Sequence, residues 1–339
     1  MPPPQHSSPD RADILRLLRE HIPDAVHDLA AIQVEGPIVV TRHSRIFRAQ
    51  VPGLPTPLVV KYLIDPSTGS PNGGAARVQF EALDRVHRAT KIPDPAYRIP
   101  VPYFVAESRG IVVAEWVDGR PMTEMLLSSR LTVAQAQDLA RRAARWLRHF
   151  CALRPLPPMP LDIAGMLHGI GDMENTKLSR YRFARAAFAA LRQHAVAAGS
   201  LAVERSWLHG DFKSDNLLVD DATTIGIDMY ARHESSVAHD LASFVNHWEL
   251  TLCNPRAWRW WSHRQLFART FLDEFDPTCR KERRLSYAWI ALFGMLGLWD
   301  EFTRRRQRTL RHAYLAACFR RIIRRMTREL AEAADGRAA

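Results

Sequence analysis

The spacing of apolar residues changes twice along the chain. Between residues 10 and 21 the apolar positions fall on one face of a helix, after a Ser-Pro pair that favours a helix start. Short β-branched or alternating runs, separated by turn residues, then predict an antiparallel meander over residues 37–40, 45–51 and 57–62. A helix is predicted over residues 75–89, followed by strands over 103–107 and 111–116. Residues 30–116 are therefore expected to form a sheet with one crossing helix.

From about residue 117 the pattern becomes helical. Apolar positions recur with helical spacing over residues 132–153, and a helix rich in alanine and arginine is predicted over 177–198. The prolines of residues 154–160 predict a loop of fixed backbone. A strand, turn and strand over residues 206–228 interrupt the helices, and the chain from residue 239 onward is predicted to be helical.

The charge of the chain is unevenly placed. The composition, 47% hydrophobic and 24% charged over 339 residues, excludes a disordered or collagen-like chain. Residues 251–339 hold 19 Lys and Arg against 9 Asp and Glu, which supplies +10 of the total net charge of +11. Such an asymmetry indicates an anionic partner: nucleic acid, an acidic membrane surface or a phosphorylated substrate.

The cysteines and the N-terminal residues indicate the cellular compartment of the protein. Cys151, Cys253, Cys279 and Cys318 show neither zinc-ligand spacing nor a disulfide framework, so reduced thiols are expected. No signal peptide and no spanning apolar run is present in the sequence. We therefore predict a cytoplasmic protein.

The candidate chemistry lies in one polar stretch between predicted strands. Asp211 is followed five residues later by Asn216, and Asp228 stands at the end of the next predicted strand. Phosphoryl transfer from a nucleotide needs a group that takes the acceptor's proton and oxygen ligands for Mg²⁺. One carboxylate, an amide and a second carboxylate in this order supply both.

This pattern resembles the aminoglycoside phosphotransferase family, also called the phosphotransferase enzyme family, of the protein kinase-like superfamily. The resemblance extends over roughly residues 30–245. It implies a bilobal protein kinase-like α+β fold with a small antiparallel-sheet N-lobe and a larger, mainly helical C-lobe. The predicted parts are an N-terminal helical extension (1–29), a nucleotide-binding N-lobe (30–117) and a catalytic and acceptor-binding C-lobe (118–339) that ends in a basic helix.

The resemblance also assigns roles in the polar stretch. It makes Asp211 the general base or hydroxyl-orienting group, and it makes Asn216 and Asp228 the Mg²⁺ ligands. His209 and Asp240 are expected to support the loop rather than to react.

In the predicted N-lobe the resemblance points to nucleotide contacts. Lys61 is expected to contact the α and β phosphates of ATP, and Glu81 to pair with it. Main-chain groups from Glu115 to Val117 are expected to bind adenine. Where the family has a nucleotide-covering loop, residues 41–47 contain no glycine; Ser44 matches a serine common there, with Arg42 or Arg45 as further phosphate ligands.

Two further departures concern the acceptor. Lys213 follows Asp211 by two residues, as in Ser/Thr protein kinases, and is predicted to contact the γ-phosphate. Asp228 is followed by Met229-Tyr230, and only eleven residues separate it from Asp240, which is too few for the activation segment of a protein kinase. A small-molecule acceptor is therefore favoured over a protein.

Two segments, one rich in tryptophan and one rich in arginine, each allow more than one interpretation. The tryptophans at 248, 258, 260 and 261 are expected to pack between helices, with a stacking platform or cation cage as the alternative. In residues 304–330 an apolar residue recurs every four positions among arginines, which favours a docked helix with solvated arginines. An electropositive acceptor or docking site and contact with anionic lipid are the alternatives; nucleic acid is least favoured because no recognised nucleic-acid module accompanies the charge.

We thus predict a Mg²⁺-dependent enzyme that transfers the γ-phosphate of ATP to a hydroxyl of a sugar, amino sugar or amino alcohol. The positive C-terminal segment favours a neutral or anionic acceptor, unless acids at 273–274 or 300–301 form a local patch. The alternative is a kinase-like regulator or non-catalytic nucleotide-binding protein with a basic docking or membrane-surface helix. The acceptor, the choice of ATP or GTP, a role in antibiotic resistance and the oligomeric state stay open.

Overall fold

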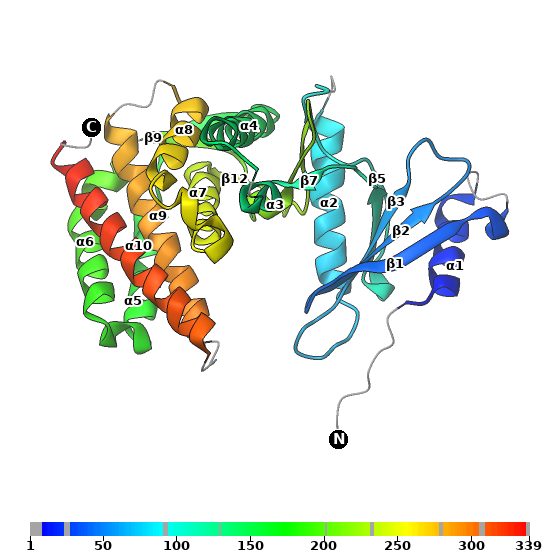
Figure 1. Cartoon of the computed structure of the whole chain (residues 1–339), viewed down its shortest axis with the longest axis horizontal. Helices are drawn as coiled ribbons and strands as arrows, with labels where there is room; N and C mark the ends of the chain where they lie inside the picture. Colours follow the sequence, from blue (N-terminus) through cyan, green and yellow to red (C-terminus); the bar gives the residue numbers. More distant parts are fainter. Residues whose placement is uncertain are drawn as a thin grey trace. The chain divides into compact units, whose positions relative to one another are not determined.

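The computed structural model describes residues 9–23, 28–90, 94–128, 130–200, 202–230, 234–277, 281–304 and 309–336 (Figure 1). The chain divides into two compact units. Unit 1 comprises residues 1–119 with 218–232, and unit 2 comprises residues 120–217 with 233–339.

Unit 1 is built on a five-stranded antiparallel sheet of order β1-β2-β3-β6-β5. Its strands are β1 (Gln33–Val40), β2 (Ser44–Gln50), β3 (Leu58–Leu63), β5 (Pro102–Ala106) and β6 (Ile111–Glu115). The predicted meander and the two later strands are confirmed. Its helices are α1 (Arg11–His21) and α2 (Gly73–Ala89), with short 3-10 turns η2 (Leu29–Ala31) and η3 (Glu107–Arg109).

The two helices cover opposite faces of this sheet (Figure 1). Side chains of α1 pack with Val60 and Val113, whereas Ala76 of α2 packs with Leu63 and Val112. Because neighbouring residues of a strand point to opposite faces, β6 is buried on both sides and is apolar from Ile111 to Ala114. The same alternation places Lys61 of β3, between Val60 and Tyr62, on the face that carries α2.

A short parallel pairing of two strands attaches residues 218–232 to unit 1. Strand β11 (Thr224–Gly226) pairs with β4 (Tyr97–Arg98), and β10 (Leu217–Val219) neighbours β11. The pairing anchors the segment that ends in Asp228, so this carboxylate belongs to unit 1.

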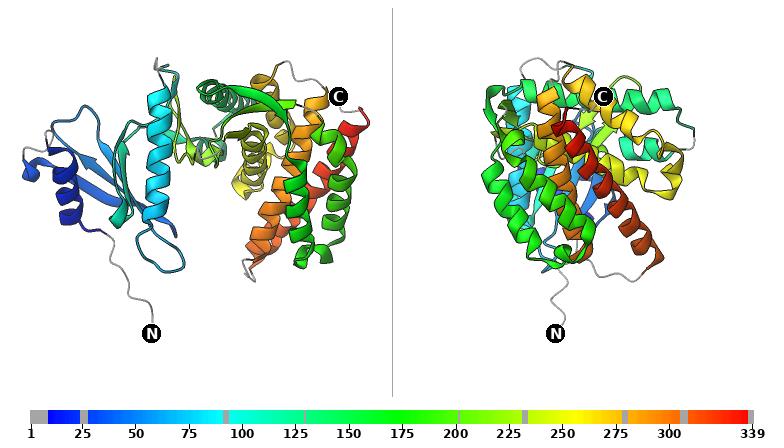
Figure 2. Two further views of the ribbon diagram at one scale, coloured as in Figure 1. Left: turned by 180° about the vertical axis from the view of Figure 1, so that it is seen from behind. Right: turned by 90° about the vertical axis from the view of Figure 1, so that its left-hand side faces the viewer.

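Unit 2 is mainly helical. Its helices are α3 (Met122–Leu127), α4 (Val133–Ala152), α5 (Ile163–Glu174), α6 (Arg182–Gly199), α7 (Ala238–Leu252), α8 (Arg264–Phe275), α9 (Lys281–Arg304) and α10 (Leu310–Ala334), with 3-10 segments η4 (Lys177–Arg180), η5 (Ser214–Asn216) and η6 (Pro255–Trp260). Figure 2 shows α5, α6, α9 and α10 packed side by side. Its strands are β7 (Arg120–Pro121), β8 (Leu156–Pro160), β9 (Ala202–Trp207) and β12 (Glu234–Ser236).

The prediction of a loop over residues 154–160 is wrong for most of that segment. Leu156–Pro160 forms β8, which pairs antiparallel with β9 at the edge of a three-stranded sheet of order β12-β9-β8. Proline has no amide proton, so it can occupy a strand only where one side needs no ladder partner. An edge strand meets this condition.

The structure is an α+β fold with an antiparallel sheet in unit 1 and mostly helices in unit 2. None of the helices that the structure describes is both long enough and apolar enough to span a membrane. Cys151, Cys253 and Cys318 are free thiols, and Cys279 lies outside the described residues.

Candidate active site

The loop between β9 and β10 is held by one buried carboxylate. Asp240, near the start of α7 and 2% exposed, accepts a hydrogen bond from the His209 amide at 2.7 Å and from the Gly210 amide at 3.1 Å. Gly210 has a φ of 84°, a left-handed conformation that glycine adopts without a Cβ penalty. The turn before Asp211 is therefore fixed by both its backbone and its partner.

Burial shapes the electrostatics of this support. It raises the pKa of Asp240 to about 7, against the two backbone donors, which lower it. His209 is fully buried, with its ring 5.7 Å from that of Trp146 and 5.5 Å from that of Phe212. His209 thus anchors the loop in the aromatic core, in the supporting place expected for it.

The structure brings Asp211, Lys213 and Asn216 together in unit 2. Oδ2 of Asp211 accepts from Nζ of Lys213 at 2.6 Å and from Nδ2 of Asn216 at 3.0 Å. Asn216 Nδ2 also donates to the Asp211 carbonyl at 2.8 Å. The carboxylate is thereby fixed in orientation, while its Oδ1 receives no donor from the described residues.

The same bonds orient Asn216 as an oxygen ligand. Because Nδ2 faces Asp211, the amide oxygen Oδ1 points the other way and can coordinate a hard cation. The adjacent Ser214 is held by a hydroxyl contact to Thr123 of α3 at 2.7 Å. Thr123 supports η5 from a distant part of the sequence, and no local pattern points to it.

His247 is a further residue at this loop that the sequence reasoning did not single out. It lies seven residues after Asp240, about two helical turns, and so on the same face of α7. Burial lowers its pKa, and the positive charge of Lys213 lowers it further. The spacing from Asp240 is the signal that would have revealed it.

In unit 1, Lys61 and Asp228 form a close ion pair. Nζ of Lys61 lies 2.6 Å from Oδ1 of Asp228; the lysine side chain is 12% exposed and the aspartate 37%. Asp228 has a φ of 60°, in the left-handed region that aspartate tolerates better than most residues. The turn after β11 therefore aims this carboxylate at the strand lysine.

The expected pairing of Glu81 with Lys61 is wrong for this structure. Glu81 is 58% exposed and its nearest cation is Arg77, one turn earlier on α2 at 3.9 Å. The buried polar residue of α2 is Gln79, whose Nε2 donates to the Tyr230 hydroxyl at 2.7 Å. Residues two apart on a helix point in nearly opposite directions, so burying Gln79 exposes Glu81.

The turn between β1 and β2 is tight and held by one threonine. Oγ1 of Thr41 accepts from the amides of His43 at 3.1 Å and Ser44 at 2.9 Å, and it lies 3.0 Å from the Ser44 hydroxyl. Arg45 donates to the Thr41 carbonyl at 2.6 Å. The turn therefore needs no glycine, and Ser44 is buried against Thr41.

At the end of β6 the main-chain donors are partly used. The amide of Glu115 donates to the Val101 carbonyl and that of Trp116 to the Pro57 carbonyl, both at 2.8 Å. The Glu115 carboxylate accepts from Arg98 at 2.8 Å. The Val117 amide, in contrast, has no hydrogen-bond partner among the described residues.

The described residues offer few protein ligands for a metal ion. No group of three or more His, Cys, Asp or Glu side chains in the described ranges could hold one. Asn216 and Asp228 offer an amide and a carboxylate oxygen, which suits Mg²⁺, an ion that keeps water and phosphate oxygens in its shell. Their chemistry therefore fits the predicted ligand pair.

Comparison with solved structures identifies the class of fold. A glucosamine kinase in complex with glucosamine, ADP and phosphate has a TM-score of 0.57 at 15% identity, covering 94% of this chain and 83% of its own. A choline/ethanolamine kinase family protein from Mesorhizobium loti has a TM-score of 0.58 at 14% identity, covering 96% and 99%. The streptomycin-ATP-APH(2'')-IIa complex has a TM-score of 0.54 at 12% identity, covering 96% and 99%. The fold is that of the protein kinase-like phosphotransferases.

The family follows from the sequence match. The pattern of the phosphotransferase enzyme family matches residues 71–275, more than half of the chain. The chain belongs to this phosphotransferase enzyme family, and it is a small-molecule kinase that uses a hydroxyl-bearing acceptor. No curated protein matches the chain with significance.

Proposed function

We propose that this kinase transfers the γ-phosphate of ATP to a hydroxyl of a sugar, amino sugar or amino alcohol, with Asp211 as the base. The observation that carries the proposal is the fixed Asp211 carboxylate, held by Lys213 and Asn216 on a loop that Asp240 supports. A preorganised group of this kind can orient an acceptor hydroxyl with little cost at the moment of reaction.

Asp211 accepts the acceptor's proton in this proposal. Its Oδ2 is occupied by two donors, so Oδ1 is the atom that receives a hydrogen bond from the acceptor hydroxyl. As the oxygen bonds to phosphorus, the proton passes to Oδ1 and the phosphorus–oxygen bond to ADP breaks. Lys213, bonded to Asp211 through Nζ, is placed to offset the charge on the γ-phosphate.

The nucleotide contacts rest on residues of unit 1. Lys61 is the proposed ligand of the α and β phosphates, and its Nζ lies 2.6 Å from the Asp228 carboxylate. Asp228 and Asn216 would hold Mg²⁺, which neutralises phosphate charge when bound. Ser44 and the main chain at Glu115 and Val117 remain proposed nucleotide contacts, with the Val117 amide as the available donor.

Three of the four acids at 273–274 and 300–301 form ion pairs with arginines. Glu274 lies 2.8 Å from Arg145, Asp273 lies 3.8 Å from Arg284, and Asp300 pairs with Arg304. This pairing supports a neutral or anionic acceptor rather than a polycation.

The test is acceptor-dependent release of ADP over a panel of sugars, amino sugars and amino alcohols. Asp211→Ala should lower turnover by at least about 100-fold with nucleotide binding retained. The matched control is Asp215→Ala, which removes an exposed carboxylate from the same loop and should change turnover less than about threefold. Full activity of Asp211→Ala would refute the assignment of the base. A Mg²⁺-dependent thermal shift with ATP, but no turnover with any acceptor, would favour a non-catalytic nucleotide-binding protein.

A further inference from the structure

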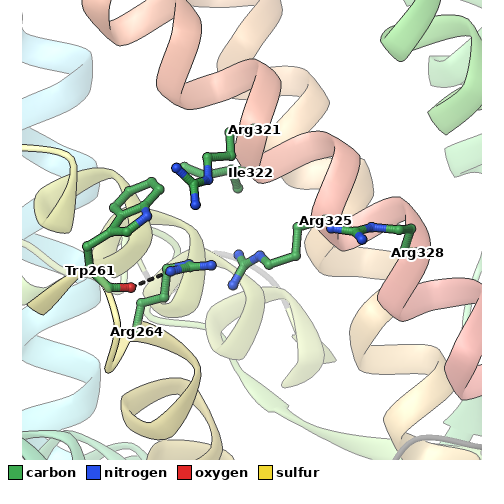
Figure 3. Close-up of a pocket in the computed structure, with 6 residues that line it drawn as sticks. All are labelled: Trp261, Arg264, Arg321, Ile322, Arg325 and Arg328. Atoms are coloured by element: carbon green, nitrogen blue, oxygen red, sulfur yellow. Dashed lines mark hydrogen bonds between the residues drawn. The ribbon is translucent and has the colours of Figure 1, made fainter.

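Arginines of α10 converge with the segment between η6 and α8 on a small cavity of unit 2 (Figure 3). We call it the arginine pocket; it encloses about 100 Å³ and is lined by Trp261, Arg264, Arg321, Ile322, Arg325 and Arg328. A wider groove of about 380 Å³ adjoins it along α10 and shares Arg321 and Arg328. The sequence left the role of these arginines open, and the structure shows that several of them face one space.

The charges of the arginine pocket do not cancel. Arg325, with a side chain 10% exposed, lies 2.8 Å from Glu249 and 3.6 Å from Glu329, and Arg264 lies 4.0 Å from Glu249. Arg321 and Arg328 form no ion pair with any carboxylate in the described part of the chain. Four guanidinium groups therefore face two carboxylates, and two positive charges are left over.

Two buried donors in the arginine pocket have no hydrogen-bond acceptor among the described residues. They are Nε1 of Trp261 and Nε of Arg325, and the latter lies 3.6 Å from Glu329, beyond hydrogen-bond distance. Arg264 and Arg321 stack on the Trp261 ring, with Cζ 4.7 Å and 5.0 Å from its centroid. Burial and the nearby charges of Arg325 and Arg321 lower the pKa of Arg264, which records the repulsion between these groups. An anion in the pocket would accept from the free donors and relieve that repulsion.

Helix α7 separates the arginine pocket from the catalytic loop. Asp240 and His247 share the face of α7 that meets the loop, through the His209 amide and the charge of Lys213. Glu249, the partner of Arg325, follows Asp240 by nine residues, about two and a half turns, and so lies on the opposite face. The pocket is therefore not the place where an acceptor meets Asp211.

We propose that the arginine pocket binds a small phosphate-bearing anion, either inorganic phosphate or a phosphate monoester. A phosphate dianion matches the two unpaired positive charges, and its oxygens can accept from several guanidinium groups at once. The site is distinct from the loop that carries Asp211, so a phosphate would bind there whether or not an acceptor is bound at Asp211.

The depth of the arginine pocket favours a small ligand over an extended polyanion. Its inner wall is the buried Arg325 with Trp261, whereas Arg321 and Arg328 are exposed at the rim. A membrane surface or a nucleic-acid backbone would meet the rim arginines but would not reach the inner donors. Binding of those partners is accordingly an outcome to be tested.

The test is calorimetric titration of the full chain with inorganic phosphate at constant ionic strength. Wild type should show one saturable site, and the double variant Arg321→Gln, Arg328→Gln should weaken it by about tenfold or more. The matched control, Arg182→Gln with Arg311→Gln, removes two exposed arginines that do not line the pocket and should change the affinity by less than about twofold.

Fluorescence gives an independent readout. Phosphate should alter the emission of wild type, and Trp261→Phe should abolish that change while saturable binding persists. Absence of saturable phosphate binding to wild type, or equal weakening in the control pair, would overturn the proposal. Binding confined to phosphatidylserine vesicles or to an oligonucleotide, with none to inorganic phosphate, would also overturn it and assign the arginines to a surface contact. A glucose 6-phosphate titration separates a phosphate ester from free phosphate as the preferred form.

Discussion

Replacing Asp240 by asparagine tests how the loop between β9 and β10 is held. The pKa of Asp240 is raised from an ordinary 3.8 to about 7, chiefly by burial. Between these two values the folded protein binds a proton that the unfolded chain does not. The stability that this proton provides is complete below the unfolded pKa and is lost as the pH rises through about 7.

The size of the effect follows from the shift. At about 1.4 kcal/mol per pKa unit, the whole shift is worth about 4 kcal/mol, of which about 2 to 3 kcal/mol is lost between about pH 5 and pH 8. Asparagine keeps one acceptor oxygen but opposes an N–H to the second backbone donor, so Asp240→Asn should be less stable than wild type at pH 5 by about 1 to 3 kcal/mol. Asparagine does not titrate, so from pH 5 to pH 8 the variant should gain about 2 to 3 kcal/mol of stability relative to wild type.

Urea unfolding at several pH values, followed by tryptophan fluorescence, measures this gap. The matched control is Asp172→Asn, an exposed carboxylate of α5 that touches no part of the loop. A gap between Asp240→Asn and wild type that stays constant from pH 5 to pH 8 would refute the reasoning about the buried carboxyl.

Three substitutions address the proposed site, all measured by ADP release with a working acceptor. Lys61→Met should lower kcat/KM for ATP by about 10- to 100-fold, because it removes a charged donor to phosphate; unchanged kinetics would contradict its role. Asn216→Ala should move half-maximal activation to at least about fivefold higher Mg²⁺, and an unaltered Mg²⁺ curve would exclude Asn216 as a ligand. Glu81→Gln should change turnover less than about twofold, since Glu81 is 58% exposed beside Arg77, whereas a large loss would show that it turns inward during the reaction.

Much of the fold was predictable because its local signals agree with its packing. The first predicted helix is α1, where Asp10 and Asp13 form a reciprocal capping box. The runs at 57–62 and 111–116 become β3 and β6, whose apolar residues pack on both faces of the sheet. Helix α10 was also expected, although Arg304 of the predicted segment ends α9, and Arg305, Arg306 and Arg308 lie outside the described residues.

Other elements depend on contacts that no local pattern records. Strand β8 exists because its prolines lie at a sheet edge beside β9, which is distant in sequence. Helix α5 was not predicted; its two glycines within the last two turns weaken the helical signal. Both elements are fixed by tertiary packing.

The candidate site also contains parts that local sequence predicts and parts that depend on distant contacts. Asp211, Lys213 and Asn216 lie within six residues of one another, so the loop that joins them could be recognised from sequence. The Lys61–Asp228 pair joins residues 167 apart, and choosing Asp228 over Glu81 as the partner depends on which face of α2 is buried. The tryptophans also differ in their surroundings. Trp248 and Trp260 are buried in the core, Trp260 with Arg259 over its ring, whereas Trp261 is half-buried and stacks with two arginines.

The threonine-held turn at Thr41 has a consequence for the forces that bind nucleotide. In a glycine-rich loop the free amides can meet phosphate oxygens as neutral dipoles. Here the amides of His43 and Ser44 already donate to Thr41, so in the proposed site the phosphate charge would be met by cationic side chains, the buried Lys61 and the exposed Arg42. An exposed charge such as that of Arg42 is screened by salt, whereas short hydrogen bonds to backbone dipoles are screened much less. ATP affinity in this kinase should therefore fall more steeply with ionic strength than in relatives whose turn leaves its amides free.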